Sequence, residues 1–206
     1  GPSSRPYQSS SRAAGPAVRD EDWYGRELGP RDRYEGYAFY DLDWTEVVSE
    51  GAVFDGCVFS GVAFNTSRHT GSAFLNCSFR GCSFFDARFE GCKAVGSDFQ
   101  RAAFRLLAVD GGDWSFAALP GADLRGASFD GVRLREADLT GARLEEAVLT
   151  RCDLSGAALD GVRLAGADLR GSDLSALDPQ AAQARGTRID LDQAALLAAA
   201  LGYEVG

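Results

Sequence analysis

The chain has 206 residues, of which 30 are acidic and 21 are basic, for a formal net charge of −9. This balance argues against direct binding to a nucleic-acid backbone, because affinity for phosphates comes from Lys and Arg. No run approaches the ~18–20 apolar residues that a membrane-spanning helix needs, so no membrane partner is expected. The length allows one domain or two small ones.

We interpret residues 1–19 as a tag remnant and a flexible tail, because GPSSRPYQSSSR is polar and of low complexity. Residues 20–51 are less regular than the chain that follows. Counting back in fives from Phe54 reaches a serine and then three aromatic residues, Trp44, Phe39 and Tyr34. These aromatics either continue a repeat or simply cover the apolar end of a stack. Since an open stack must close its core and its strand edge, we predict an N-terminal cap with degenerate repeats over 20–51.

A five-residue unit then repeats without insertion or deletion over residues 52–176, as in GADLR, GASFD, GVRLR, EADLT and GARLE (121–145). Its central slots, at steps of five from 34 to 174, carry Phe, Leu, Trp or Tyr at 25 of 29 positions. The position two residues before each central slot carries a small residue, and we call it the small slot. The position immediately before the small slot, which we call the corner slot, is often glycine. A period of five fits neither a helix nor an ordinary strand. It fits a chain that turns every five residues, with glycine at the corners. We predict an all-β solenoid.

The units GADLR, EADLT and GSDLS resemble the A(D/N)LXX signature of the pentapeptide repeat family. That family folds as a right-handed quadrilateral β-helix, so the resemblance implies a coil of about 20 residues. RHTGSAFLNCSF (68–79), GADLRGASFDGVRLREADL (121–139) and RIDLDQAALLAAALG (188–202) are similar to the mycobacterial and Qnr-type fluoroquinolone-resistance members of the family. Those members are dimeric rods that resemble B-form DNA and bind DNA gyrase. The long N-terminus and many outward residues of this chain depart from them.

All the cysteines fall in the small slot: Cys57, Cys77, Cys82, Cys92 and Cys152. A free cysteine behaves there as a small buried hydrophobe. The odd count and core placement favour reduced thiols in a cytoplasmic protein. With a coil of about 20 residues, Cys57 and Cys77 would be stacked neighbours, so a disulfide between them stays open. No Cys or His spacing indicates a metal site, and no cofactor is expected.

His69, the single histidine, stands in a central slot. No nucleophile with an orienting carboxylate can be assigned around it, so we interpret it as marking a bulge or a partly solvated coil rather than a catalytic site. Ala94 is expected to stack one coil before Trp114, whose indole would fill the room that the alanine leaves. Leu106 and Phe116 stand in outward slots, either as a contact surface or buried by a local distortion.

Binding to a partner must involve the repeat positions whose side chains point away from the core, which we call outward slots. The span 52–176 holds 16 acidic and 13 basic residues, so its bulk charge does not indicate DNA mimicry. Positions one coil apart should instead form a column, at the ~4.8 Å spacing of strands, of Glu90, Asp110 and Asp130. Like charges at that spacing repel by ~0.9 kcal/mol per pair even at the dielectric constant of water, so the fold gains nothing from the column. We predict a gyrase-binding surface there, with three further acids on the adjoining face: Asp98, Asp138 and Asp160. The alternative is that these charges only keep the rod soluble.

The repeat is expected to end at Leu174, and residues 177–206 should form a helical cap and dimerisation segment. Asp178-Pro179 is a helix start signal, with the helix running through Ala184. Asp190 and Gln193 have the spacing of a capping box for a second helix. That helix would seal the coil and, as the resemblance implies, form the two-fold contact of a homodimer through Leu191, Leu196, Leu197 and Leu201.

Two functions follow. The first is an acidic dimeric rod that binds DNA gyrase, at its DNA-binding subunit, its ATPase subunit or both. The rod would modulate the enzyme and protect it from fluoroquinolones or a topoisomerase-targeting natural toxin. The alternative is an interaction scaffold with an unrelated protein partner, because fold does not fix function. An enzyme is not expected, since no carboxylate pair in a cleft, phosphate loop or triad spacing is present.

Overall fold

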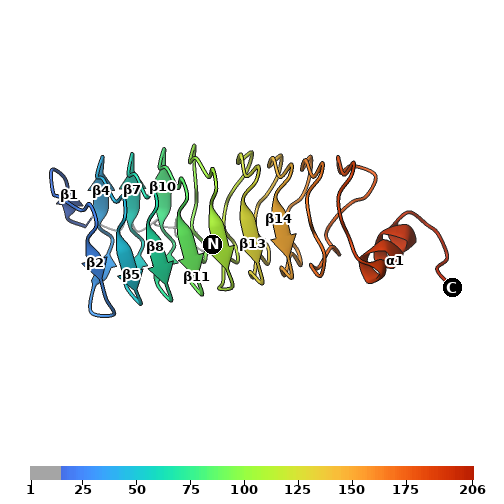
Figure 1. Cartoon of the computed structure of the whole chain (residues 1–206), viewed down its shortest axis with the longest axis horizontal. Helices are drawn as coiled ribbons and strands as arrows, with labels where there is room; N and C mark the ends of the chain where they lie inside the picture. Colours follow the sequence, from blue (N-terminus) through green and yellow to red (C-terminus); the bar gives the residue numbers. More distant parts are fainter. Residues whose placement is uncertain (1–14) are drawn as a thin grey trace, which may run out of the picture.

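The computed structural model describes residues 15–206, so the tag remnant expected within residues 1–14 lies outside the described residues. The chain forms a coil of stacked parallel strands that ends in a helix, α1 (Leu191–Ala200) (Figure 1). The predicted all-β solenoid with a C-terminal helical segment is confirmed. Among the described residues, no helix is both long enough and apolar enough to cross a membrane.

Three sides of the coil carry strands. Sheet C contains β3 (Arg33–Glu35), β6 (Val53–Asp55) and β9 (Ala73–Leu75). Sheet A contains β1 (Ala17–Val18), β4 (Ala38–Tyr40), β7 (Val58–Ser60) and β10 (Ser78–Arg80). Sheet B contains β2 (Glu27–Leu28), β5 (Val48–Glu50), β8 (Arg68–Thr70), β11 (Arg88–Glu90), β12 (Ala108–Asp110), β13 (Ser128–Asp130) and β14 (Val148–Thr150).

A fourth side is held by isolated parallel bridges, which begin at Asp43↔Ala63 and continue to Arg163↔Gln183. Along the chain each coil visits sheet C, sheet A, the fourth side and sheet B in that order. Sheets A and B therefore lie on opposite sides of the coil, as their labelled strands do in Figure 1. This order decides which outward residues can share a surface.

The coil length follows from the register between neighbouring strands. Phe54 pairs with Phe74 in sheet C and Phe59 with Phe79 in sheet A, so each coil takes 20 residues. Backbone bonds run in both directions from one coil: the Phe74 amide donates to the Lys93 carbonyl at 2.7 Å, and the Ala73 amide donates to the Ala52 carbonyl at 2.9 Å. The backbone polar groups are thus paired between coils, and the central side chains can stack.

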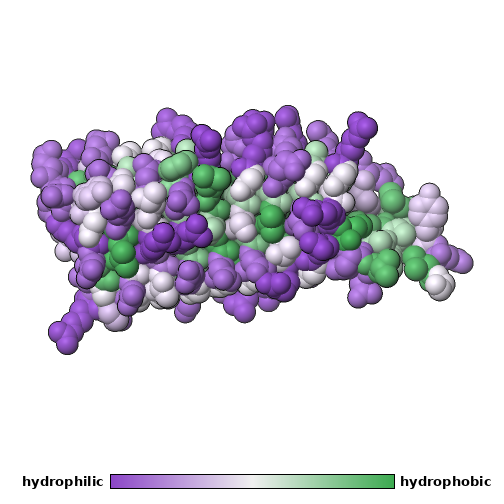
Figure 2. Space-filling model, in the orientation of Figure 1, coloured by the Kyte–Doolittle hydropathy of each residue, from purple (hydrophilic) through white to green (hydrophobic). Residues whose placement is uncertain are grey.

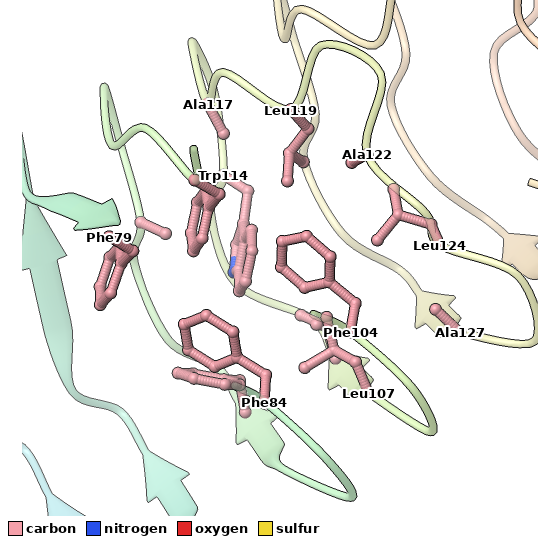
Figure 3. Close-up of a cluster of buried hydrophobic side chains, with 14 of the residues drawn as sticks. Phe79, Phe84, Phe104, Leu107, Trp114, Ala117, Leu119, Ala122, Leu124 and Ala127 are labelled. Carbon is pink, nitrogen blue, oxygen red and sulfur yellow. The ribbon is translucent and has the colours of Figure 1, made fainter. Parts of the chain in front are cut away.

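The central slots form ladders of aromatic rings inside the coil. Phe39, Phe59 and Phe79 stack with ring centroids 4.8 and 4.9 Å apart and interplanar angles of 7° and 6°. Figure 3 shows Trp114 inside the coil among phenylalanines of the preceding coils, with Leu119 and Leu124 in the same coil as Trp114. The Trp114 ring stacks on Phe99, which lies in the preceding coil on the adjacent side, at 5.4 Å and 4°. We infer that the indole leans into the space that Ala94 leaves, as the sequence predicts.

Residues in the small slot point inward and also bond to the backbone. The Cys77 thiol donates to the Phe54 carbonyl at 3.5 Å, and the Ser97 hydroxyl donates to the Phe74 carbonyl at 2.8 Å. Cysteine and serine are thus equivalent in this slot. All the cysteines are buried and free, and burial raises the pKa of Cys82, Cys92 and Cys152 to about 11. The side chains therefore act as core residues.

Both ends of the coil lie beyond the boundaries expected from the sequence. Ala17 and Val18 pair with β4, so residues 17–18 are strand and not flexible tail. The offset to β4 is 21 residues, whereas β3 pairs with β6 at 20, so one extra residue lies within 29–32. This insertion shifts the earlier central slots by one, to the buried Val18, Trp23 and Leu28. Counting back in fives from the regular repeat therefore misses the central residues of the first coil.

At the other end the helix expected from Asp178 to Ala184 is wrong: these residues make a further turn of the coil. The Asp178 carboxylate accepts from the Gln180 amide at 2.8 Å, the same bond that Asp138 makes with Thr140 at a coil corner. An aspartate that bonds the amide two residues on starts a turn as well as it caps a helix. The start signal at Asp178 was therefore ambiguous.

The helix α1 forms as expected and closes the coil through polar contacts. Asp190 and Gln193 make the predicted capping box. Gln193 is buried, and its side-chain amide donates to the carbonyls of Leu169 and Ser172 at 2.6 and 2.7 Å. The Asp190 carboxylate accepts from the Gly171 amide at 2.8 Å. Backbone groups of the last complete coil are thus satisfied by two side chains at the start of the helix.

His69 lies inside the coil, which corrects the interpretation of a bulge or a partly solvated coil: its exposed fraction is 1%. Nδ1 lies 2.6 Å from the Ser49 hydroxyl and Nε2 lies 3.0 Å from the Ser67 hydroxyl. Because Ser67 donates to the Phe64 carbonyl, the imidazole donates from Nε2 and accepts at Nδ1. Ser72 joins the cluster at 2.8 Å from Ser49. The neutral ring is therefore fully hydrogen-bonded, because Ser49 in the central slot of the previous coil and Ser67 in a small slot are both its partners.

Burial lowers the pKa of His69 to about 3. An unfolded chain binds this proton near pH ~6.5, so the folded state loses stability as the pH falls below that value toward 3. We expect about 2 kcal/mol of the free energy of unfolding to be lost between pH 6.5 and pH 5. In the variant His69→Phe this loss should be largely absent, whatever its absolute stability. Urea unfolding at the two pH values measures it, and an equal loss in both proteins would contradict the assignment.

Candidate functional site

The predicted acidic column forms on sheet B. Glu90, Asp110 and Asp130 each end a strand, and they pair in register, Glu90 with Asp110 and Asp110 with Asp130. The preceding residues Phe89 and Val109 are buried, so the acids project outward. Three carboxylates thus follow one another at the spacing of successive coils.

The charge of the column is uneven because one member has partners. Asp130 accepts from the Thr150 hydroxyl at 2.8 Å and forms an ion pair with Arg151. Glu90 and Asp110 are exposed, and neither has an ion pair or a side-chain hydrogen bond with another residue of the described chain, 15–206. The uncompensated negative charge is therefore centred on Glu90 and Asp110.

Sequence reasoning missed two basic residues on the same face. Arg68 and Arg88 are neighbours in the register of β8 and β11, two positions before the acidic column. Arg88 lies 3.5 Å from the Asp86 carboxylate, whereas small residues replace the arginines in the next two strands. A depression of about 270 Å³ lies between the two rows, lined by Arg88, Ala108 and Ser128 on one side and by the acids on the other. The available signal in the sequence was the spacing of 20 residues between Arg68 and Arg88.

The other predicted acids do not belong to this surface. Asp98 bridges to Ser78 of β10 and Asp138 bridges to Ala118, which places both on the side of sheet A; Asp160 ends the same side one coil later. Since sheets A and B are opposite, the expectation of an adjoining face is wrong. The physical reason is the four-sided coil: residues eight or ten apart lie two sides apart. Asp98 is half-buried, and the Oδ1 atom of its carboxylate has no hydrogen-bond partner.

The C-terminal helix presents an apolar surface. Leu191, Leu196 and Leu201 have exposed fractions of 87%, 39% and 44%. Leu197 packs against the core of the coil instead. Tyr203 and Val205 are also exposed, and Figure 2 shows apolar side chains gathered at this end of the molecule. Three of the four predicted dimerisation residues are thus available for contact, and the fourth anchors the helix.

Leu106 and Phe116 resolve an alternative that the sequence left open. Both side chains are exposed, so a local distortion does not bury them. Within residues 15–206, no group of three His, Cys, Asp or Glu side chains is placed to hold a metal ion.

Comparison with known families matches the profile "Pentapeptide repeats", in 8 copies, to residues 70–105, 115–145 and 137–175. The chain is a pentapeptide-repeat protein. The matched residues lie within the regular coils, and the profile leaves residues 15–69, 106–114 and 176–206 of the described chain unmatched. A comparison with curated protein sequences gives no significant match.

Solved pentapeptide-repeat structures resemble this protein along most of its length. Full-length QnrB1, a plasmid-mediated fluoroquinolone resistance protein, is 21% identical with a TM-score of 0.52, over 88% of this chain and 97% of that chain. HetL, a protein involved in heterocyst differentiation regulation from the cyanobacterium Nostoc sp. strain PCC 7120, is 20% identical with a TM-score of 0.62, over 85% of this chain and 87% of that chain. At such identities the likeness concerns the fold, and function must be argued from the surface.

Proposed function

We propose that this protein is a DNA-mimicking homodimer that binds DNA gyrase, modulates it, and protects it from fluoroquinolones or a topoisomerase-targeting natural toxin. The observation that carries the proposal is the column of Glu90, Asp110 and Asp130, held in register along a rod. The resemblance of the sequence to fluoroquinolone-resistance proteins supports the same function. So does the shape that the coil shares with QnrB1.

The mechanism is competition for the cationic surface on which gyrase holds DNA. Carboxylates at regular intervals on a stiff rod present a line of negative charge, as a phosphate backbone does. Such a line raises the rate of encounter with a basic surface and sets the register of the complex. Arg68 and Arg88 lie beside the start of the column, so the most negative stretch begins at Glu90 and runs toward Asp110. This asymmetry would orient the rod on its partner.

A second copy would join at the C-terminal end. Leu191, Leu196 and Leu201 leave apolar surface exposed beyond the last coil, where a two-fold contact would bury it. Apolar surface of this kind is the usual core of a homodimer interface. The two rods would then extend in opposite directions, which doubles the length of charged surface. Gyrase and a second copy of the chain are thus assigned to different parts of the molecule.

The decisive experiment is DNA supercoiling by purified gyrase, assayed with and without this protein and with and without a fluoroquinolone. We expect the protein alone to change the supercoiling rate and to reduce drug-stabilised cleavage complexes. Binding to each isolated gyrase subunit identifies the contact. If supercoiling, cleavage and binding to both subunits are all unaffected, the proposal is wrong, and the scaffold with an unrelated protein partner becomes the better function.

Charge reversal tests the column itself. The triple variant Glu90→Lys, Asp110→Lys, Asp130→Lys should weaken gyrase binding by about tenfold at low salt, and by less at high salt, because salt screens exposed charges. The triple reversal of Asp98, Asp138 and Asp160 changes the net charge equally on the opposite side, so it is the matched comparison. Isothermal titration measures both. Equal losses would mean that net charge, rather than the column, determines binding.

The helix surface makes a separate prediction. Wild-type protein should sediment as a dimer, and Leu191→Ser combined with Leu196→Ser and Leu201→Ser should sediment as a monomer with an intact coil. Analytical ultracentrifugation and far-UV circular dichroism measure the two properties. Leu197→Ser is the contrasting variant, because Leu197 packs against the core and its loss should lower the melting temperature. A monomeric wild-type protein would contradict the assignment.

A further inference from the structure

A row of alternating charges lies on the side of sheet C, around the corner from the acidic column. Its members follow Ala73 of β9 in register on successive coils: Lys93, Asp113, Arg133 and Asp153. We call these four residues the charge ladder. Each member directly precedes a buried central residue, so its side chain points outward. Positive and negative groups therefore alternate along the rod at the ~4.8 Å spacing of strands.

The two middle members of the ladder satisfy each other, whereas the two end members do not. The Arg133 guanidinium donates to the Asp113 carboxylate at 2.9 Å. Lys93, the single lysine of the sequence, forms no ion pair with any residue of the described chain, 15–206. Asp153 accepts from the amide and the hydroxyl of Ser155 at one carboxylate oxygen, and it also lacks an ion pair within these residues. One positive and one negative end are thus left for a partner.

The corner between the ladder and sheet B is hollow because it carries glycine. Gly91 and Gly131 stand at this corner, and with Gly112 they line a depression of about 550 Å³ along the ladder. Arg151 takes the same corner position one coil after Gly131, and its side chain is 70% exposed at the end of the depression. The corner therefore has no side chain at Gly91 and a bulky one three coils later.

The charge ladder is complementary to its own reverse. When a second copy faces it with the rods antiparallel, every positive member meets a negative one. Lys93 of each copy meets Asp153 of the other, and Asp113 of each copy meets Arg133 of the other. Such a reciprocal contact, in which residue i meets j and j meets i, defines a two-fold interface. The end members, which have no ion pair within one chain, gain one in the pair.

The corner fits a second copy in the same register. Three coils separate Gly91 from Arg151, as they separate Lys93 from Asp153. The arrangement that matches the charges therefore also brings Arg151 of each copy onto Gly91 of the other. The bulky corner of one copy is received where the other has no side chain. Charge and shape, which depend on different residues, thus agree on one register.

We propose that the charge ladder binds a second copy of this chain, packed side by side and antiparallel. The contact is separate from the apolar surface of the C-terminal helix, and it rests neither on that surface nor on gyrase. Because corner meets corner, sheet B of both copies faces the same side, and the two acidic columns run antiparallel next to each other. Exposed ion pairs contribute little each, so the contact is weak and forms at high protein concentration.

The test removes the helix contact by using the full chain with Leu191→Ser, Leu196→Ser and Leu201→Ser, which we call the leucine variant. Small-angle X-ray scattering over a concentration series measures its shape. We expect a monomer in dilute solution and a pair as the concentration approaches about 1 mM, the dissociation constant of a weak contact. A side-by-side pair widens the cross-section with little change in length, whereas an end-to-end contact lengthens the particle. A monomer throughout, or a longer particle of unchanged cross-section, would overturn the proposal.

Charge exchange within the leucine variant separates the ladder from the net charge. Lys93→Glu and Asp153→Lys should each weaken pairing by about tenfold, because each places like charges opposite each other twice in the pair. An equimolar mixture of the two variants should pair as the leucine variant does, since opposite charges meet again. This rescue also shows that both variants are folded. Failure of the mixture to pair contradicts the proposal. So does stronger pairing of Asp153→Lys, which is expected if only the net charge matters.

The corner offers a matched pair of substitutions. Gly91→Arg puts an arginine opposite Arg151 of the other copy and should weaken pairing by about tenfold. Gly71→Arg makes the same change one coil earlier, opposite Gly171, and should leave pairing unchanged. An added Cβ meets no atom within 4 Å at Gly91 or Gly71, and Arg151 itself has φ +55° at this corner, so both variants should fold. Equal effects of the two arginines would argue against the register. No topoisomerase enters the assay, so its failure is distinct from failure of the proposed function.

Discussion

The hydrogen-bonded register between successive coils is the constraint on which the rest of the structure depends. Backbone amides bond to carbonyls of both neighbouring coils, so a residue stacks on the one 20 positions later. Inside, this register turns the central slots into aromatic ladders and lets small-slot residues such as Cys77 and Ser97 donate to a carbonyl of the coil before. Outside, it turns a repeated residue into a column. The outward side chains can therefore repeat along the length of the rod, and they differ from one side of the coil to the next.

The side-to-side separation explains how an acidic protein can present two different surfaces. Sheet B carries exposed carboxylates in register, whereas the fourth side carries Arg105 beside small apolar residues and an ion pair between Asp123 and Arg125. The net charge of the protein describes neither of these two surfaces. A stiff scaffold keeps the two apart, since no loop within the coil allows Glu90 to reach Arg105. A partner that recognises one side thus need not interfere with a partner on another.

The five-residue period predicted the solenoid, the inward cysteines and the in-register acids, because regular repetition ties sequence spacing directly to space. The prediction failed where an inserted residue interrupts the five-residue period, and where one sequence pattern is compatible with two local structures. The extra residue within 29–32 hid the first coil, and Asp178 starts a coil corner instead of a helix. The true position of Asp98 required counting sides as well as coils. The burial of His69 depended on Ser49 and Ser67, whose roles appear only when three coils are stacked.

The buried imidazole also bears on how the rod would come apart. In a stack each coil touches only its neighbours, so cooperativity passes from coil to coil and is limited by the weakest junction. His69 belongs to β8, and it stacks on Phe89 of the next coil while it bonds to Ser49 of the previous one. A proton there loosens an internal junction rather than an end. Acid would therefore divide the rod within its aromatic ladder, between the coil of Ser49 and the coil of Phe89.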